Sequence, residues 1–294
     1  MFHPDRLAAG LAAMAQERHD DARLALREAA GDGVLLARAL LDCLEHDDAG
    51  TVYDRPAAFE AFIRGGGNVP LYEATSAALA QLYGTHDVDT LLDLGCGDGM
   101  ALIPALERTQ RVPRYVDIVE PSEALLASAM ERLRTGRRFQ LAHLHAWRQT
   151  AQDFAAALQP DQHWDLAQST FALQSLPPAE RRQTLKRLRP HVRRLALVEF
   201  DVPVLDPGSD AHYASLAQRY QRALDGYGSD AELIAGGFLA PMLLGQLQPD
   251  ARPSNWEQPI AQWVEELRES GYALELEQKL YDYSWSPAVL MVFV

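Results

Sequence analysis

The sequence has few of the features that mark secreted, membrane-spanning or metal-binding proteins. It contains only two cysteines in 294 residues, Cys43 and Cys96, and they form neither a disulfide framework nor a metal-ligand spacing. No apolar run approaches the length needed to cross a bilayer, and the first residues lack the order of charge, apolar run and cleavage site of a signal peptide. We therefore expect a soluble cytoplasmic protein in a reducing compartment.

Positive charge is also scarce, with 27 basic against 41 acidic residues and a net charge of −14. Basic residues concentrate only at residues 132–138 and 181–194, and leucines interrupt the second stretch as in an amphipathic helix. A polyanionic partner is therefore disfavoured. We expect a small-molecule substrate, and neither nucleic acid nor membrane as a partner.

The most informative stretch is a short apolar run followed by glycines at alternate positions. Residues 90–94 predict a buried strand and residues 100–108 a helix, so the glycines form a strand-to-helix turn with free backbone N–H groups. Residues 115–120 predict a second strand that ends at Glu120. A carboxylate at that point can accept two hydrogen bonds from a ribose diol.

The glycine spacing is G-x-G-x-G, whereas the dinucleotide fingerprint of dehydrogenases is G-x-G-x-x-G. Asp93 lies two positions before the first glycine, where an acid repels phosphate and suits an ammonium group. Together with Glu120, the stretch resembles the cofactor motif of class I S-adenosylmethionine-dependent methyltransferases; it reads Asp93-Leu94-Gly95-Cys96-Gly97-Asp98-Gly99.

This resemblance implies S-adenosyl-L-methionine as the cofactor and methyl transfer as the reaction. It implies that the backbone of the turn contacts the methionine portion, that Asp93 lies near its amino group and that Glu120 binds the ribose hydroxyls. Tyrosines near a sulfonium can give cation–π or oxygen contacts. The cofactor-binding residues expected on this basis are Asp93, Gly95, Cys96, Gly97, Glu120, Pro121, Gln168 and Tyr72.

From residue 88 onward, strand and helix patterns alternate, which predicts an α/β fold with a Rossmann-like, mostly parallel seven-stranded sheet. The last two strands should form an antiparallel hairpin within the sheet. Residues 1–83 predict an N-terminal helical cap, and residues 84–294 the methyltransferase core, in which residues 201–255 form a helical lid insertion. The strands are expected at residues 90–94, 115–120, 138–142, 164–169, 195–200, 272–280 and 288–294.

The family usually places an acidic residue after strand three, next to the adenine. This sequence has instead a stretch with two histidines and a tryptophan, so His145, Ala146 or Trp147 is expected to make the adenine contact. The two histidines, His143 and His145, have no nearby cysteine or acid to complete a ligand set, and we expect no metal site.

Methyl transfer depends mainly on alignment, and a base is needed only if the nucleophile must lose a proton. The segment after strand four often carries a histidine pair in this family, but here it has Gln174 and Ser175, which are poor bases. The candidate catalytic residues are therefore Glu199, His143 and His212.

Several functions fit these observations. The first is O- or N-methylation of a small molecule, for example in natural-product biosynthesis. The second is a different reaction on the same fold and cofactor, and the third is a non-catalytic cofactor-binding partner protein. The signatures Asn-Pro-Pro-Tyr and Asp-Pro-Pro-Tyr of nucleobase and protein-amide methyltransferases are absent. The N-terminal helices suit either a cap or a homodimer interface.

Overall fold

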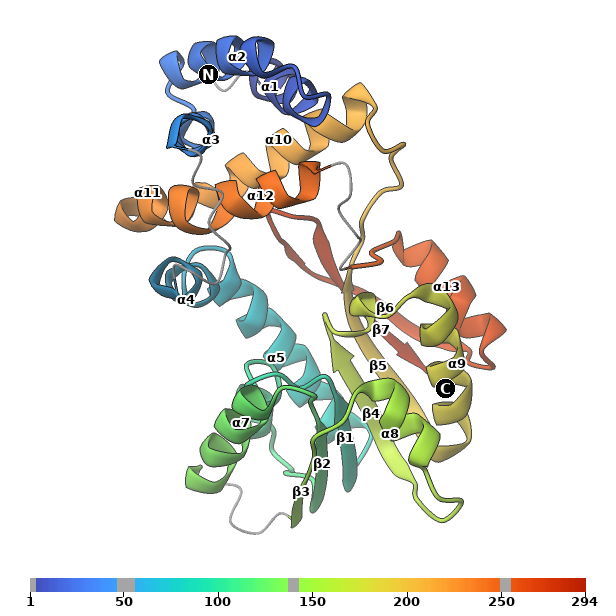
Figure 1. Cartoon of the computed structure of the whole chain (residues 1–294). Coiled ribbons are helices and arrows are strands. Elements are labelled where there is room, and N and C mark those ends of the chain that lie inside the picture. The colour runs from blue at the N-terminus through green and yellow to red at the C-terminus, as the bar shows by residue number, and fades with distance from the viewer. Residues whose placement is uncertain (1–3, 47–55, 137–142, 249–254) are drawn as a thin grey trace. The chain divides into compact units, whose positions relative to one another are not determined.

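The computed structural model describes residues 4–46, 56–136, 143–248 and 255–294. Its chain forms two compact units, each assembled from separate segments (Figure 1). The helical unit comprises Met1–Val69, Val204–Pro253 and Tyr283–Ser286, and the sheet unit comprises Pro70–Pro203, Ser254–Asp282 and Pro287–Val294.

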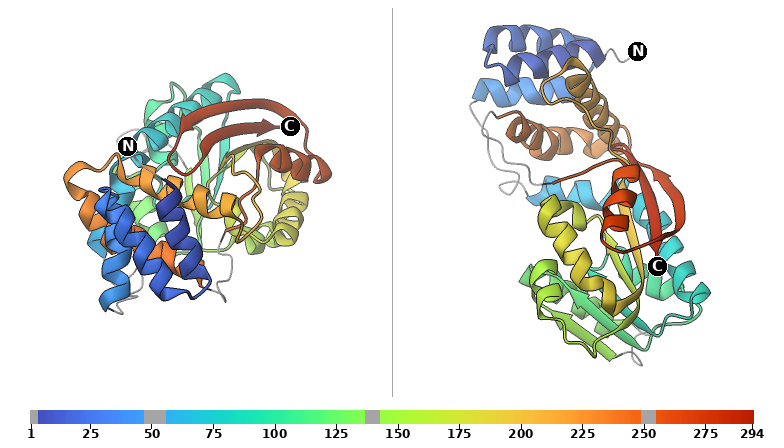
Figure 2. Two further views of the ribbon diagram at one scale, coloured as in Figure 1. Left: turned by 90° about the horizontal axis from the view of Figure 1, so that it is seen from above. Right: turned by 90° about the vertical axis from the view of Figure 1, so that its right-hand side faces the viewer.

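The sheet unit contains a seven-stranded sheet in the order β3-β2-β1-β4-β5-β7-β6 (Figures 1 and 2). The first five strands are parallel, and β7 runs antiparallel between β5 and β6. The predicted fold class and the C-terminal hairpin within the sheet are therefore confirmed. The strands are β1 (Thr90–Leu94), β2 (Tyr115–Val119), β3 (His143–Trp147), β4 (Trp164–Thr170), β5 (Val192–Phe200), β6 (Leu274–Asp282) and β7 (Pro287–Phe293).

Helices cover both faces of this sheet, as a mostly parallel sheet requires. Successive strand side chains point to opposite faces, so Leu91 packs in one apolar cluster and Leu92 in another. The first cluster lies under α5 (Asn68–Thr85), α6 (Leu102–Arg108) and α7 (Glu123–Thr135), and the second under α8 (Ala151–Ala157), α9 (Pro178–Leu188) and α13 (Ile260–Glu269).

Strand three differs from its prediction. Residues 138–142, where the strand was expected, lie outside the described residues. The strand is His143–Trp147, which the sequence suggested as the loop beyond it, and Tyr115 of β2 pairs with His143. The prediction failed because β3 is an edge strand whose two histidines are exposed and polar, so it lacks the apolar run of a buried strand.

The helical unit packs around one apolar core. Its helices are amphipathic, and the buried face of α10 places Tyr213 and Tyr220 inside the core. A π-helical turn over Ala235–Leu239 contains two adjacent glycines. The helices are α1 (Pro4–Ala15), α2 (His19–Gly31), α3 (Leu35–His46), α4 (Pro56–Arg64), α10 (Asp210–Leu224), α11 (Ala231–Ile234) and α12 (Ala240–Leu247).

Asn68 joins the three segments of the helical unit through its side-chain amide. Its Nδ2 donates to the carbonyl of Phe62 (2.8 Å) and to the hydroxyl of Tyr227 (3.1 Å). Its Oδ1 accepts from the hydroxyl of Tyr283 (3.0 Å), and Tyr227 in turn donates to the Phe62 carbonyl (2.8 Å). All of these polar atoms are thus paired within the unit.

Among the described helices, none combines the length and the apolar composition needed to cross a membrane.

Candidate functional site

The turn after β1 is shaped by glycines in the left-handed region. Gly95 has φ +73° and Gly97 φ +55°. A Cβ atom on Gly95 would overlap the Cβ of Ala172, so only glycine lets the turn lie this close to the segment after β4. At Gly97, by contrast, an added Cβ would meet no atom within 4 Å. The backbone of Gly97 therefore faces open space.

Backbone hydrogen bonds fix this turn against the end of β2. The amides of Gly95 and Cys96 donate to the carbonyl of Val119, at 2.8 and 3.2 Å. Burial raises the pKa of the Cys96 thiol well above its ordinary value. Pro121, two residues beyond that carbonyl, is exposed. Gly95 and Cys96 thus contribute the form of the turn, and their N–H groups are already used.

Glu120 is the first residue beyond β2 and lies in contact with the glycine turn. Its Oε2 accepts from the amide of Gly97 (3.1 Å), and its Oε1 accepts from the amide of Ser122 (2.9 Å), the N-cap of α7. A carboxylate has about four acceptor positions, so these bonds leave two of them for the hydroxyls of a ligand.

Asp93 is a buried carboxyl group at the centre of the sheet unit. It is 3 % exposed and lies opposite Gln168 of β4, whose Nε2 donates to Asp93 Oδ2 (3.0 Å). The hydroxyl of Tyr83 donates to Gln168 Oε1 (2.6 Å), which fixes the orientation of that amide. Burial raises the pKa of Asp93 to about 7, with a smaller contribution from the charge of Glu120, while the Gln168 hydrogen bond opposes the rise.

A cation placed beside Asp93 would restore its ionised form, because an opposite charge favours the charged state of a buried acid. Gln168 was expected at this site, and the structure brings it together with Asp93. Tyr83 was not identified from the sequence, where its spacing on a helix matches that of any core residue.

Aromatic side chains surround the turn after β4. Phe171 has φ +52°, a strained conformation for a residue with a side chain. Its ring stacks on Phe200, with 4.3 Å between the ring centroids, and meets the edge of Tyr72 at 6.2 Å. Burial, aided by the charge of Asp98, raises the pKa of Tyr72 to about 12, so its phenol keeps its proton at neutral pH.

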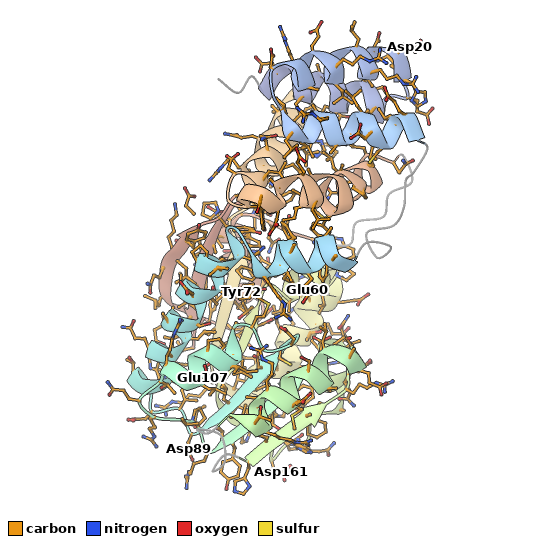
Figure 3. The ribbon with its side chains drawn as sticks, turned by 90° about the vertical axis from the view of Figure 1, so that its left-hand side faces the viewer. Asp20, Glu60, Tyr72, Asp89, Glu107 and Asp161 are labelled. Atoms are coloured by element: carbon orange, nitrogen blue, oxygen red, sulfur yellow. The ribbon has the colours of Figure 1, made fainter. Side chains whose placement is uncertain are left out.

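Tyr72 therefore lies with the loops at the carboxyl ends of the strands. Asp89 and Asp161, which precede β1 and β4, mark the opposite end of the sheet (Figure 3).

Glu199 lies on the other face of the sheet from Asp93. It is fully buried and follows Leu195 and Leu197 on the face covered by α9 and α13. Burial raises its pKa to about 8, and the positive charge of Arg181 opposes this rise. Its side chain points away from the face that carries Asp93, and its role as a catalytic base stays a prediction.

The two candidate histidines also fall outside the turn. His143 begins β3 and stacks on Tyr115, at the amino end of the sheet and away from the glycine turn, and its role as a base stays a prediction. His212 lies in the first turn of α10 in the helical unit, where its Nδ1 accepts from the amide of Gly208 (3.2 Å). The role of His212 stays a prediction.

His145, Ala146 and Trp147, the residues expected to contact adenine, all lie within β3, and this role stays a prediction. The indole of Trp147 donates to Asp117 (3.0 Å) and packs against Phe154, so it belongs to the core, and Ala146 is a strand residue. Gln149, two residues beyond the strand, has a buried Oε1 for which no partner exists among the described residues. Gln149 was not identified from the sequence, because the end of strand three was placed too early in the chain.

In the described part of the chain, no three histidine, cysteine or acidic side chains come together as metal ligands.

Comparison with known proteins identifies the domain that carries this site. Residues 92–197, which span β1 to β5, match the family model described as "Methyltransferase domain". These residues therefore form a methyltransferase domain, and the sheet unit has the fold of class I S-adenosylmethionine-dependent methyltransferases. No curated protein matches the sequence.

Solved structures share the fold of the methyltransferase domain at low sequence identity. Magnesium protoporphyrin IX methyltransferase from Synechocystis, with bound S-adenosylmethionine, is 13 % identical with a TM-score of 0.51, over 82 % of this chain and 93 % of that chain. The mitomycin 7-O-methyltransferase MmcR is 15 % identical with a TM-score of 0.51, over 97 % and 72 %. SCL7 of Oryza sativa is 14 % identical with a TM-score of 0.62, over 88 % of each chain.

The described residues fit S-adenosylmethionine on three observations. Gly97 faces open space, Asp93 is a buried acid that a cation would stabilise, and Gln149 has a buried oxygen without a donor. S-adenosylmethionine has a group to match each of three side chains. Its ammonium group is complementary to Asp93, its ribose diol to Glu120 and its adenine amino group to Gln149.

Proposed function

We propose that this protein methylates an oxygen or nitrogen atom of a small molecule. The observation that carries the proposal is the buried Asp93 carboxyl beside a glycine turn that Glu120 closes from the neighbouring strand. Two fold neighbours whose printed names give a small-molecule acceptor, a magnesium protoporphyrin and a mitomycin, support the class of substrate. The net charge of −14 also favours a small acceptor over a polyanion.

Each polar group of the site has a proposed partner on the cofactor. Asp93 would hold the ammonium group of the methionine portion, and Glu120 the two ribose hydroxyls. The Oε1 of Gln149 would accept from the adenine amino group, which gives this buried atom the donor that it lacks. The open backbone at Gly97 would leave room for the cofactor to lie against the turn.

The cofactor supplies an electrophilic methyl group on a positively charged sulfur. The chain contributes alignment and a dry surface, which suffice for much of the rate increase in such a transfer. Gln174 and Ser175 brace the turn after β4, because Gln174 Nε2 donates to the carbonyl of Phe171 (3.2 Å) and Ser175 Oγ to that of Ala172 (2.6 Å). Neither side chain serves as a base.

The acceptor atom therefore has to be nucleophilic without help from this turn. A carboxylate, a phenolate or a neutral amine meets this requirement, whereas an aliphatic hydroxyl does not.

Binding and transfer are tested separately. Calorimetry with S-adenosylhomocysteine should show binding to the wild type. Glu120→Gln should lower the affinity by at least tenfold, because an NH2 group then replaces one of the two carboxylate oxygens that accept hydrogen bonds from the ribose hydroxyls. Tritiated-methyl transfer to a fractionated small-molecule extract should then label a carboxylic acid, a phenol or an amine. Gly97→Arg, which fills the open space beside the turn, serves as the inactive control.

Two outcomes would contradict the proposal. If S-adenosylhomocysteine does not bind, the assignment of the site is wrong. If it binds and no small molecule is labelled while protein or nucleic acid is, the acceptor class is wrong. Binding with no label in any fraction would favour another reaction or a non-catalytic role.

A further inference from the structure

Strand β6 forms an open edge of the sheet. In the described part of the chain β7 is its only strand partner, and most of its nine residues are exposed. Leu274 and Leu276 are 40 % and 39 % exposed, although both are large apolar residues. An edge of this kind presents unpaired backbone N–H and C=O groups that can accept a further strand.

Two irregularities limit how another strand can add to this edge. The register of β6 against β7 shifts between Leu274 and Leu276 and again between Lys279 and Tyr281. Between these shifts, residues 276–279 pair regularly with residues 289–292 of β7. A partner strand therefore has one short regular segment to pair with, and that segment carries both an acidic and a basic residue.

We propose that β6 pairs with β6 of a second copy of this chain, antiparallel and about a two-fold axis at Gln278. In this register Glu277 lies opposite Lys279 of the other copy, and the contact occurs twice. Leu276 comes next to Leu280, which lies at the second irregularity, also twice, and the two Gln278 amides face each other. Opposite charges and leucine pairs across antiparallel strands both stabilise the pairing.

The side chains lie on suitable faces for this contact. Glu277 and Lys279 lie opposite Met291 and Val289, on one face of the sheet. Leu276 lies opposite Val292 on the other face, where Leu280 packs against the same apolar cluster. Charged pairs and leucine pairs therefore meet on separate faces of the joined sheet.

Charge also selects this register against its neighbours. A shift that centres the two-fold axis on Glu277 places two carboxylates opposite each other, and the Glu275 that it brings opposite Lys279 is already paired with Arg194 of its own chain (2.7 Å). A shift to Lys279 places two ammonium groups opposite each other. Lys279 contacts Asp282 within its own chain at 3.4 Å, but an exposed pair of this kind contributes little and is easily exchanged. A protein strand without an acid at the matching position would meet Lys279 unpaired.

The expected dimer is weak, since a single pair of edge strands buries much less than the roughly 1,200–2,000 Å² typical of stable interfaces. Sedimentation velocity over a dilution series of the full chain should show a monomer–dimer equilibrium. Glu277→Lys and Lys279→Glu should each weaken association by at least tenfold, because each creates two like-charge contacts per dimer. The double variant E277K/K279E exchanges the charges and should restore association.

Glu131→Lys, the same charge change on exposed α7, serves as the matched control and should leave association unchanged. A wild type that stays monomeric at all concentrations overturns the proposal. So does a dimer that is insensitive to both single variants, since its interface then lies elsewhere, and so does a double variant that fails to recover. Circular dichroism of each variant establishes that it remains folded.

Discussion

At the scale of single residues, the buried Asp93 carboxyl couples ligand binding to pH. Its pKa is raised to about 7 in the cofactor-free protein, chiefly by burial, so it is about half protonated near neutral pH. An ammonium group requires the ionised form. Below pH 7, the ionised fraction of Asp93 therefore falls about tenfold for each further unit of pH.

We predict that the affinity for S-adenosylhomocysteine falls by up to about tenfold per pH unit below pH 7 and is flat above pH 8. Asp93→Asn should bind more weakly at pH 8 and lose this pH dependence, because the amide does not titrate. Calorimetry between pH 5.5 and 8.5, within about one to two units of the titration, measures both effects. Asp161→Asn, an exposed acid at the opposite end of the sheet, is the control. An unchanged pH profile in Asp93→Asn would show that another group titrates.

The stability of the cofactor-free protein should follow the opposite trend. A folded-state pKa of about 7, above the ordinary value of 3.8, means that the folded state holds a proton that the unfolded state releases. The contribution of Asp93 to the free energy of unfolding is therefore greatest below pH 4 and falls as pH rises to 7. Affinity for the ligand and stability without it thus respond to pH in opposite directions.

At the scale of elements, the glycine turn and the segment after β4 form one packed unit. Gly95 and Gly97 both have positive φ, but only Gly95 would place a Cβ against Ala172. The backbone cost of about 1–2 kcal/mol is common to both positions. The steric cost arises at Gly95 alone.

Gly95→Ala should lower the free energy of unfolding by about 3 kcal/mol, and Gly97→Ala by about 1 kcal/mol. Urea denaturation measures both. Ala172→Gly removes the opposing Cβ, so in a double-mutant cycle Gly95→Ala should cost about 1–2 kcal/mol less in that background. Equal costs in the two backgrounds would show that the turn relaxes away from Ala172.

The sequence predicted these elements unevenly. The strand before the glycines, the acid at the end of β2 and the C-terminal hairpin were all predicted, because apolar runs and glycine spacing are local signals. The end of β3 was not, since an exposed edge strand has no such run. The face on which Glu199 lies could not be predicted either, because β5 is apolar on both faces and shows no alternation of polar and apolar residues.

At the scale of the whole molecule, contacts between distant residues could not be predicted from the sequence. Examples are the hydrogen bond from Tyr83 to Gln168 and the polar contacts of Asn68. The most distant of these partners, Tyr283, lies 215 positions from Asn68 in the sequence. No local pattern encodes contacts of that range.

Asn68→Ala should lower the free energy of unfolding by about 2 kcal/mol, because it leaves the buried hydroxyl of Tyr283 without its acceptor. Asn255→Ala, at an exposed asparagine, is the matched control and should change it by no more than about 0.5 kcal/mol. Urea denaturation followed by near-ultraviolet circular dichroism reports the change. A cost equal to that of the control would show that water replaces the lost partner.

The three-segment make-up of the helical unit has a consequence for biosynthesis. α1 to α4 leave the ribosome first, but the core that they share with α10 and α12 is complete only after Leu243 has been translated. Their apolar faces stay without their packing partners while the parallel strands β1 to β5 are synthesised. Apolar surfaces exposed in this way bind chaperones and promote aggregation. The amino-terminal helices are thus made first and folded late.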